Sequence, residues 1–399
     1  PVLVLDRTPP VIAAHFSGEA VRVYGERKFF NTETALFVTV ADRNFRVQEL
    51  KEVLEGFRAE TSGGEAAKAA GFQKALAELE GRTVSRTVWE TELPLSEDAN
   101  YEIPLGCTDL AGNQAIWQIQ TDAKDGKKHA DVEMEARTAK EVHTEYVTVD
   151  TKAPEELTLT CPAGNPVNYL PSGWVFSGEP VTVSANAGDG TAGIRAIRFI
   201  LVDENEKETV SEKVFQPLAQ SSFAVKIPDE AENFKGTVRV EAYDWAGNCR
   251  EELLSLAAES QAKHEQTGKA AITTLTKPSR TVDGTDYYNT DVTLRLAMED
   301  SFSGLSRVWY QAGDTLSGSR DYAAEAGRDL SGKAEQKITS EFVQELTLEA
   351  SENNENNRKV SAGYTDHAGH EGYAEQLYHI DVTAPEIRVE YDVSHDREG

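Results

Sequence analysis

The sequence has few of the features that define several large classes of protein. Three cysteines in 399 residues are too few, and odd in number, for a fully paired disulfide framework. No apolar run approaches the roughly 20 residues that cross a bilayer, and the start, PVLVLDRTPP, lacks the charged and apolar regions of a signal peptide. Because the first residue is Pro and not Met, we expect the chain to be a piece of a longer protein.

Basic residues are outnumbered, with 40 Lys and Arg against 68 Asp and Glu and a formal charge of −28. Such a charge repels phosphate backbones and anionic lipid, which argues against nucleic acid as a partner and against membrane insertion. The hydrophobic content of 39% is enough to build cores, and the charge is spread along the chain. We therefore expect a folded monomer of about two to four domains.

Motifs of catalysis are also missing. The sequence contains no HExxH, no GxSxG and no recognisable set of serine, histidine and acid. The Gly-rich stretches that begin at Asn186 and Glu299 do not lead from a strand into a helix, as a phosphate-binding loop must. We therefore expect that the chain is not an enzyme.

What the sequence has instead is repetition. The motif D-x-x-x-P begins at Asp6, Asp150 and Asp381, each time after an alternating apolar run. A proline just past such a run cannot donate to a strand ladder, so it suits a linker. These motifs predict joints between domains. A further joint is expected near residue 268, where the Asp is missing.

A second motif, D-x-A-G, occurs in CTDLAGN (107–113), AYDWAGN (242–248) and YTDHAGH (364–370). Apolar and polar residues alternate ahead of each copy, which is typical of a half-buried antiparallel strand. Three copies predict three tandem immunoglobulin-like antiparallel β-sandwiches. The predicted units are 1–149, 150–267 and 268–380, and residues 381–399 would begin a following repeat.

The first unit is expected to carry two insertions, near 47–82 and 121–140. In the first insertion Ser62 and Glu65 have capping-box spacing, and Gly81 can end a helix. The residues that share the apolar face of this short helix are Ala69, Phe72, Leu76 and Leu79. The second insertion is polar and charged, which is typical of a surface loop or hairpin.

The D-x-A-G motif is best explained as a turn. Its Asp accepts hydrogen bonds from nearby backbone amides, its Gly adopts positive φ, and a following Asn tolerates similar geometry. The residues predicted in these roles are Asp109, Gly112, Asn113, Asp244, Gly247, Asn248, Asp366 and Gly369.

Calcium binding is the functional alternative for these aspartates, because hard cations prefer carboxylate and carbonyl oxygens. The candidate ligands are Asp109, Asp150, Asp244, Asp366 and Asp381, with the joints at Asp150 and Asp381 as the favoured places. The acids lack the dense spacing of a dedicated calcium loop. We therefore prefer the turn interpretation from the sequence.

Other side chains have a structural and a functional interpretation. His367, His370 and His379 are close in sequence and offer a transition-metal site, although Asn replaces His370 in the other two copies. Trp245 lies at the tip of a turn, where it could stack against a sugar. For each of these we prefer the structural interpretation.

The three cysteines divide into two groups. Cys107 lies at an inward strand position and is predicted to be a buried free thiol. Cys161 and Cys249 fall near the first and last strands of the second unit. A disulfide between them is one alternative, but spacing alone does not establish the required geometry.

Together these motifs carry a resemblance. VDTKAP and IDVTAP at the joints, FFN and YYN before a strand, ADRNF after it and TDLAGN near the end resemble the tandem bacterial immunoglobulin-like (Big-type) repeats of large Gram-positive cell-surface proteins. The resemblance covers essentially the whole chain. It implies extracellular stalks of sandwiches, and no catalytic residues.

We therefore expect a non-enzymatic stalk or spacer segment of a bacterial cell-surface protein, for example an adhesin, whose partners are neighbouring immunoglobulin-like repeats. The alternative is a module that binds host protein or glycan, most plausibly through the insertions of the first unit. A third interpretation is an accessory module of a secreted enzyme. An exposed apolar patch on the insertions would favour recognition, and a charged surface favours the spacer.

Overall fold

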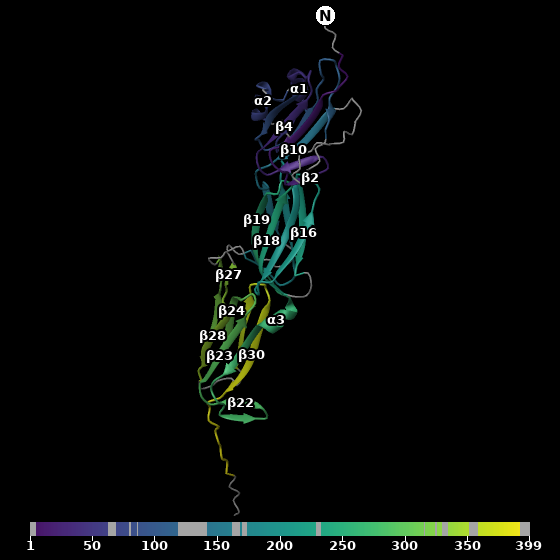
Figure 1. The fold of residues 1–399 in the computed structure, drawn as a ribbon. Coiled ribbons are helices and arrows are strands. Elements are labelled where there is room, and N and C mark those ends of the chain that lie inside the picture. Colours follow the sequence, from purple (N-terminus) through teal and green to yellow (C-terminus); the bar gives the residue numbers. More distant parts are fainter. Residues whose placement is uncertain are drawn as a thin grey trace, which may run out of the picture.

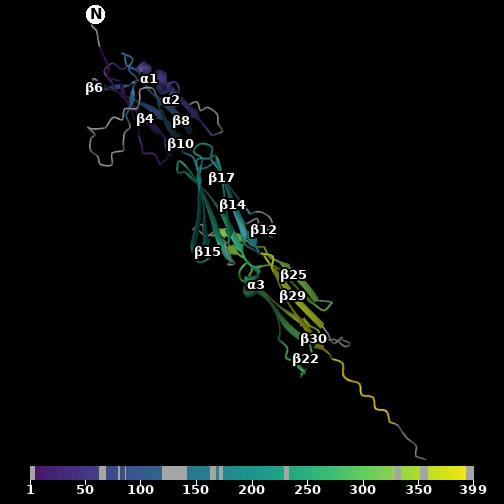
Figure 2. The same cartoon turned by 90° about the vertical axis from the view of Figure 1, so that its right-hand side faces the viewer.

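The computed structural model shows β-sandwiches placed end to end (Figure 1), and a view at right angles shows the same line of units (Figure 2). The all-β, immunoglobulin-like fold predicted from the sequence is therefore confirmed. The residues described are 5–62, 69–79, 81–85, 87–118, 142–161, 168–169, 174–228, 233–314, 316–323, 325–328, 334–350 and 358–391.

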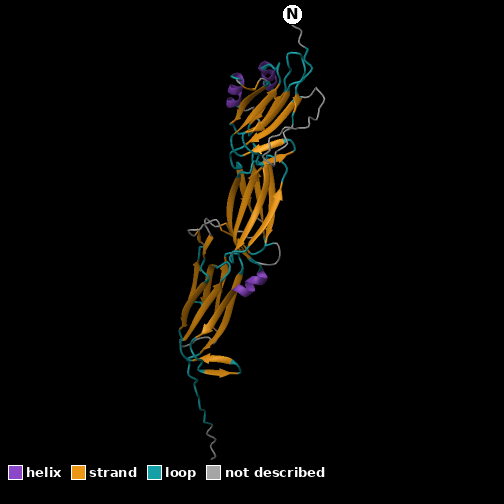
Figure 3. Ribbon diagram, viewed as in Figure 1, coloured by secondary structure: helices purple, strands orange, loops and turns teal. Residues whose placement is uncertain are grey.

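Helices are few and short in the described part of the chain (Figure 3). They are α1 (Val47–Leu54), α2 (Ala70–Ala77) and α3 (Gln261–Thr267). In these described ranges, no helix has the length and apolar character that crossing a membrane requires.

The first unit consists of two five-stranded sheets. In order across the first sheet, the strands are β6 (Arg82–Ser85), β7 (Val88–Leu95), β4 (Thr34–Ala41), β1 (Val11–Phe16) and β9 (Ile116–Trp117). Across the second sheet they are β2 (Arg22–Tyr24), β3 (Arg27–Phe30), β10 (His143–Val149), β8 (Ala99–Leu105) and β5 (Arg58–Glu60). Buried and half-buried residues alternate along β8, as the period-two pattern predicts.

The second unit pairs a three-stranded sheet with a six-stranded sheet. The smaller sheet has the order β11 (Glu156–Thr160), β14 (Val181–Gly188) and β17 (Gln220–Ile227). The larger has the order β12 (Asn168–Tyr169), β13 (Trp174–Ser177), β19 (Cys249–Ala258), β18 (Phe234–Asp244), β15 (Ile194–Asp203) and β16 (Glu208–Val214).

The third unit repeats this topology strand for strand. Its smaller sheet is β20 (Gly268–Thr274), β23 (Val292–Asp300) and β28 (Glu341–Leu348). Its larger sheet is β21 (Arg280–Val282), β22 (Thr285–Tyr288), β30 (Glu371–Ile380), β29 (Arg358–Asp366), β24 (Leu305–Ala312) and β25 (Leu316–Asp321). A separate hairpin joins β26 (Glu325–Arg328) to β27 (Ala334–Lys337). Even the register shift recurs, at the start of β15 and of β24.

Each unit has its own hydrophobic core between its two sheets. Buried residues at the centres of the three cores include Leu36, Tyr101, Phe199, Val240 and Leu294. The sheets extend over residues 11–149, 156–258 and 268–380. We keep the division into 1–149, 150–267 and 268–380 as our proposal for the domains.

The predicted helix of the first unit is present, but it begins later than expected. α2 starts at Ala70, and Ala69 precedes it with a φ of 37° and without a side-chain cap. Ser62 is therefore not its N-cap, and Glu65 lies outside the described residues. Phe72 is fully buried and packs against Phe57, with ring centroids 4.4 Å apart and the rings tilted by 44°. Packing, and not the cap, places this helix.

Two other expectations concern segments that lie wholly or partly outside the described residues. Residues 381–391 form no strand, and residues 392–399 lie outside the described residues, so the start of a following repeat stays a prediction. A strand needs a partner for its ladder, and the described residues offer none to this segment. The insertion predicted at 121–140 lies outside the described residues.

Candidate functional site

The D-x-A-G turns close the hairpins through their Asp side chains. In the second unit, Oδ1 of Asp244 accepts hydrogen bonds from the backbone N–H groups of Gly247 (2.6 Å) and Asn248 (2.9 Å). The amide of Asn248 donates to the other oxygen of Asp244 at 2.8 Å. Gly247 has a φ of 98°, in the left-handed region that glycine favours.

The other two copies have the same geometry. Asp109 accepts from the backbone N–H of Asn113 at 2.8 Å, and Asp366 accepts from that of His370 at 2.7 Å. Gly112 and Gly369 have φ values of 84° and 93°. The turn is therefore a repeated structural device.

The turns of the second and third units also contact the preceding unit. Trp245 packs against Phe29 of the first unit, with ring centroids 5.6 Å apart, and against Tyr24 at 5.0 Å. Trp245 is half-buried in this joint, which agrees with the structural interpretation that we preferred from the sequence. His367 takes the same place at the next joint, where its ring lies 5.2 Å from Phe176.

The residue that follows the last strand of each unit is recognisable by one backbone hydrogen bond. The N–H of Asp150 donates to the carbonyl of Phe30 (2.9 Å), and that of Asp381 donates to Tyr288 (2.9 Å). At the middle joint, the N–H of Glu259 donates to Ser177 at 2.8 Å. Glu259 is therefore the counterpart of the missing Asp, and α3 follows it.

Three carboxylates converge where the first unit meets the second. Asp150 at the joint, Asp189 after β14 and Asp244 in the turn place ligand oxygens within 4.8 Å of one another. All three are buried, with at most 4% of each residue exposed. Within the described residues, no lysine, arginine or histidine forms an ion pair with them. We call this group the second-joint cluster.

The environment of the second-joint cluster disfavours three negative charges. Burial, together with the charge of Asp189, raises the pKa of Asp150 to about 7. Burial also raises the pKa of Asp244 to about 6, against the hydrogen bonds from Asn248. A bound cation would remove this repulsion.

A similar cluster lies at the N-terminal end of the first unit. Asp6, Asp42 and Asp109 again have oxygens within 4.8 Å of one another, although Asp6 and Asp42 are only half-buried. The amide of Asn113 donates to the backbone carbonyl of Asp6 at 3.2 Å, as that of Asn248 donates to Asp150 at 2.9 Å. We call this group the first-joint cluster.

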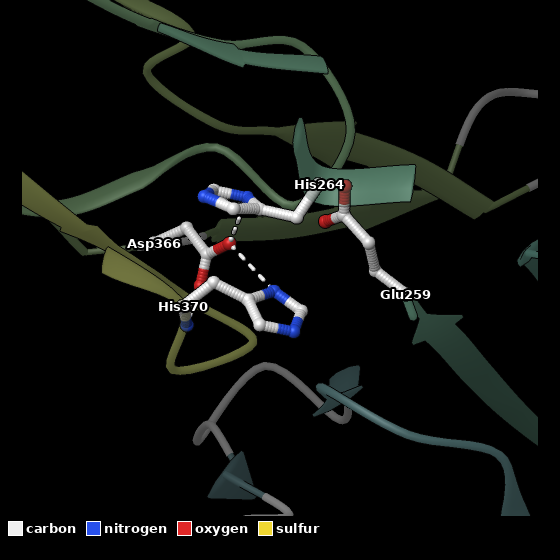
Figure 4. Close-up of side chains that lie close together, drawn as sticks. All are labelled: Glu259, His264, Asp366 and His370. Atoms are coloured by element: carbon white, nitrogen blue, oxygen red, sulfur yellow. Dashed lines mark hydrogen bonds and ion pairs between the residues drawn. The ribbon is translucent and has the colours of Figure 1, made fainter. Parts of the chain in front are cut away.

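The corresponding carboxylates, together with two imidazoles, lie where the second unit meets the third. Glu259, Asp300 and Asp366 stand where Asp150, Asp189 and Asp244 stand in the second unit. Between them, Nδ1 of His264 lies 3.5 Å from Oδ2 of Asp300 and 3.3 Å from Oδ2 of Asp366. Figure 4 shows Asp366 between the rings of His264 and His370, with Glu259 approaching from the side. We call this group the third-joint cluster.

The imidazole of His264 changes the electrostatics of the third-joint cluster. Burial opposes its charge, but contacts with Asp300 and Asp366 raise the pKa of His264 to about 10. Burial alone would raise the pKa of Asp300, but the contact with His264 lowers it, and the net result is a pKa below the ordinary value. This position in the fold therefore accommodates positive charge.

The structure brings four of the five calcium-ligand candidates from the sequence into the clusters. Asp109, Asp150, Asp244 and Asp366 each belong to one of the clusters, and His370 belongs to the third. Asp381 lies outside these clusters, and its carboxylate accepts a hydrogen bond from the N–H of Thr383.

His379 also lies outside the clusters. It is on β30, where its ring packs on Tyr287. Of the three histidines considered together in the sequence, the structure brings only His370 to a cluster.

Several cluster residues were not among the candidates. They are Asp6, Asp42, Asp189, Glu259, His264 and Asp300. A signal was present for three of them, because Asp42, Asp189 and Asp300 each directly follow or end the apolar strand that recurs in every unit. Glu259 and His264 have no repeated motif.

None of the three cysteines forms a disulfide. Cys107 is buried as predicted, and burial raises the pKa of its thiol to about 12. Cys161 and Cys249 do not form the disulfide that was considered. Arg250, next to Cys249, contacts the carbonyl of Glu155 before β11, whereas Cys161 follows the other end of that strand. Five residues of strand separate the two ends by about 17 Å.

Comparisons with known proteins show similarity of fold only. No family model and no curated protein matches the sequence. Among solved structures, the chain is similar to a tetra-tandem repeat from the extending region of a large adhesion protein, with 15% identity, a TM-score of 0.34, and coverage of 95% of this chain and 76% of that one.

Two further structures are similar at the same level. One is from a 1.5-MDa bacterial ice-binding adhesin, with 11% identity, a TM-score of 0.27, and coverage of 88% of this chain and 92% of that one. The other comprises the FN1–FN3 domains of chicken CNTN1, with 10% identity, a TM-score of 0.24, and coverage of 93% and 99%.

Proposed function

We propose that the chain is a non-enzymatic stalk segment of a bacterial cell-surface protein of the adhesin type. The observation that supports this is the end-to-end order of the units, in which the D-x-A-G turns of the second and third units pack on the preceding unit. Bending at a joint would separate Trp245 from Phe29, or His367 from Phe176. Packed joints therefore favour an extended shape, which suits a stalk that holds another part of the protein away from the cell surface. The extracellular, Gram-positive setting rests on the sequence resemblance.

Electron microscopy of the negatively stained chain tests this function. We expect three beads in line, with a narrow distribution of angles at both joints. Particles in which the first and third units fold back on each other would contradict the proposal.

We further propose that Ca²⁺ binds at the first-joint and second-joint clusters, and that at the second it stiffens the joint between the first and second units. The second-joint cluster supplies three buried carboxylates of the hard-oxygen type that Ca²⁺ prefers. The three backbone N–H groups of residues 191–193 all donate to Oδ1 of Asp189, which leaves Oδ2 for a cation. The same place in the third unit accommodates a positively charged imidazole. That is independent support for a cation at this position.

Calcium titration of chelator-treated chain tests this step. We expect two Ca²⁺ per chain by calorimetry and a higher melting temperature, because a ligand that binds the folded state stabilises it. Asp189→Asn should remove one of the two binding events. Asp203→Asn is the matched control, since Asp203 also caps a turn of the second unit but lies outside the cluster. Equal binding by the two variants would contradict the assignment.

Recognition by the first unit is the second candidate function. A cavity of about 290 Å³ lies beside Trp117 and His143, whose rings stack at 3.7 Å. Against this, the described residues of 47–82 expose no large hydrophobic side chain, which favours the spacer. A titration with simple sugars, monitored by tryptophan fluorescence, distinguishes the two functions. Trp117→Ala is the control. A saturable signal that the variant loses would favour recognition.

A further inference from the structure

The third-joint cluster differs in kind from the other two. It combines two imidazoles with carboxylates, and Glu259, His264, Asp366 and His370 place one ligand atom each within 4.8 Å of one another. These residues are 0%, 4%, 1% and 8% exposed. Imidazole and carboxylate together suit Zn²⁺ and similar transition metals, whereas oxygen ligands alone suit Ca²⁺.

We propose that the third-joint cluster is a Zn²⁺-type metal site that clamps the second unit to the third. Its ligands would be Glu259, His264, Asp366 and His370. This inference goes beyond the stalk function and does not depend on it.

The separations fit a tetrahedral metal ion. Nδ1 of His264 and Nδ1 of His370 lie 3.3 and 3.2 Å from Oδ2 of Asp366. With metal–ligand bonds of about 2.0 Å, the edge of a tetrahedron is about 3.3 Å long. Two of its edges are thus already in place.

Two of the ligand atoms that face the centre of the cluster lack hydrogen-bond partners, whereas Nδ1 of His370 and Oδ2 of Asp366 are paired with each other. Nδ1 of His264 and Oε2 of Glu259 are buried and form no hydrogen bond, although Nδ1 is close to two carboxylates. Buried polar atoms without partners are costly. A metal ion would coordinate both.

The outward atoms of the same side chains are already held. Tyr364 contacts Nε2 of His264 at 3.3 Å, Thr267 donates to Oε1 of Glu259, and the backbone N–H of His370 donates to Oδ1 of Asp366. Metal-binding histidines and carboxylates are oriented by outer contacts of this type. His264, Glu259 and Asp366 therefore each present one remaining atom to the centre of the cluster.

The ligands come from three elements on both sides of the joint. Glu259 follows β19 of the second unit, His264 lies on α3, and Asp366 and His370 belong to the turn between β29 and β30. A bound metal ion would therefore fix the linker helix and the third unit against the second. On binding, Zn²⁺ replaces the proton on Nδ1 of His264, which leaves to solvent.

Zn²⁺ titration of the chelator-treated chain in excess Ca²⁺ tests the site, with Co²⁺ as a spectroscopic probe. We expect one Zn²⁺ per chain and the visible bands of tetrahedral Co²⁺. His370→Asn restores the residue that Asn113 and Asn248 supply in the other turns, so the turn should still fold. It should weaken Zn²⁺ binding by more than about 100-fold, and Tyr364→Phe by about 10-fold.

His379→Asn is the matched control, because His379 lies on β30 outside the cluster, and it should bind Zn²⁺ like the unaltered chain. Circular dichroism and melting in chelator check that every variant is folded. Failure of the unaltered chain to bind Zn²⁺, or equal binding by His370→Asn, would overturn the proposal. Neither result would bear on the extended shape, which is measured separately.

Discussion

Trp245 of the second unit lies against Phe29 of the first, with ring centroids 5.6 Å apart. This contact joins two sandwiches whose cores are separate. A turn residue thus serves the neighbouring unit as well as its own hairpin. The equivalent residue in the first unit, Leu110, is 59% exposed, so the two positions form a natural comparison.

Trp245→Ala should loosen the second joint. Loss of a half-buried aromatic contact of this kind costs about 1 to 3 kcal/mol, and urea unfolding of the chain measures it. Leu110→Ala, at the same place in its turn, should change the free energy of unfolding by less than about 0.5 kcal/mol. Equal effects of the two substitutions would show that Trp245 does not couple the units.

Substitutions at two glycines distinguish the contribution of the turn to stability from that of the joint. Gly112→Ala forces a side chain into the left-handed region, with open space around it, and should cost about 1 to 2 kcal/mol. Gly247→Ala meets the same strain and also brings a methyl group to 3.0 Å from Val21 of the first unit. We expect the larger loss of stability at Gly247. The reverse order, by urea unfolding, would contradict the joint geometry.

The stability of the metal-free chain should depend on pH through Asp150 and Asp244. Their pKa values in the folded state are about 7 and about 6, above the ordinary value of about 3.9. The folded state therefore binds more protons than the unfolded state between about pH 4 and pH 7. Stability should fall as pH rises through this window.

Calorimetric melting in chelator from pH 5 to pH 8 measures this dependence. Asp150→Asn removes the group with the higher pKa and should flatten the curve. Saturating Ca²⁺ should flatten it as well, because the ion replaces the protons. An unchanged slope in Asp150→Asn would mean that other groups control the pH dependence.

The fold could be predicted from the sequence where it depends on interactions between residues that are close together in the chain. Alternation along 101–107 and the D-x-A-G chemistry of Asp244 and Gly247 depend on neighbouring residues alone. The seven-residue helix α3 is too short for apolar periodicity to indicate it. The start of α2 depends on the packing of Phe72 against Phe57, which lies fifteen positions away.

The clusters could be predicted only in part. Asp150 and Asp244 were candidates because each belongs to a repeated motif, but Asp189 reaches them only when the sandwich folds. Glu259 replaces Asp150 without the proline that marks the other joints. His264 has no counterpart in the first two units. Its role depends on a contact between units, which a pattern within one unit does not contain.

Small-angle scattering of the whole chain in Ca²⁺ tests the central claim most directly. Three units of about 40 Å each make a rod of about 120 Å, whose radius of gyration is about 35 Å. A compact chain of this length would have a radius of gyration of about 21 Å. We predict the larger value, with an increase in flexibility when Ca²⁺ is removed. A value near the smaller one in Ca²⁺ would contradict the account.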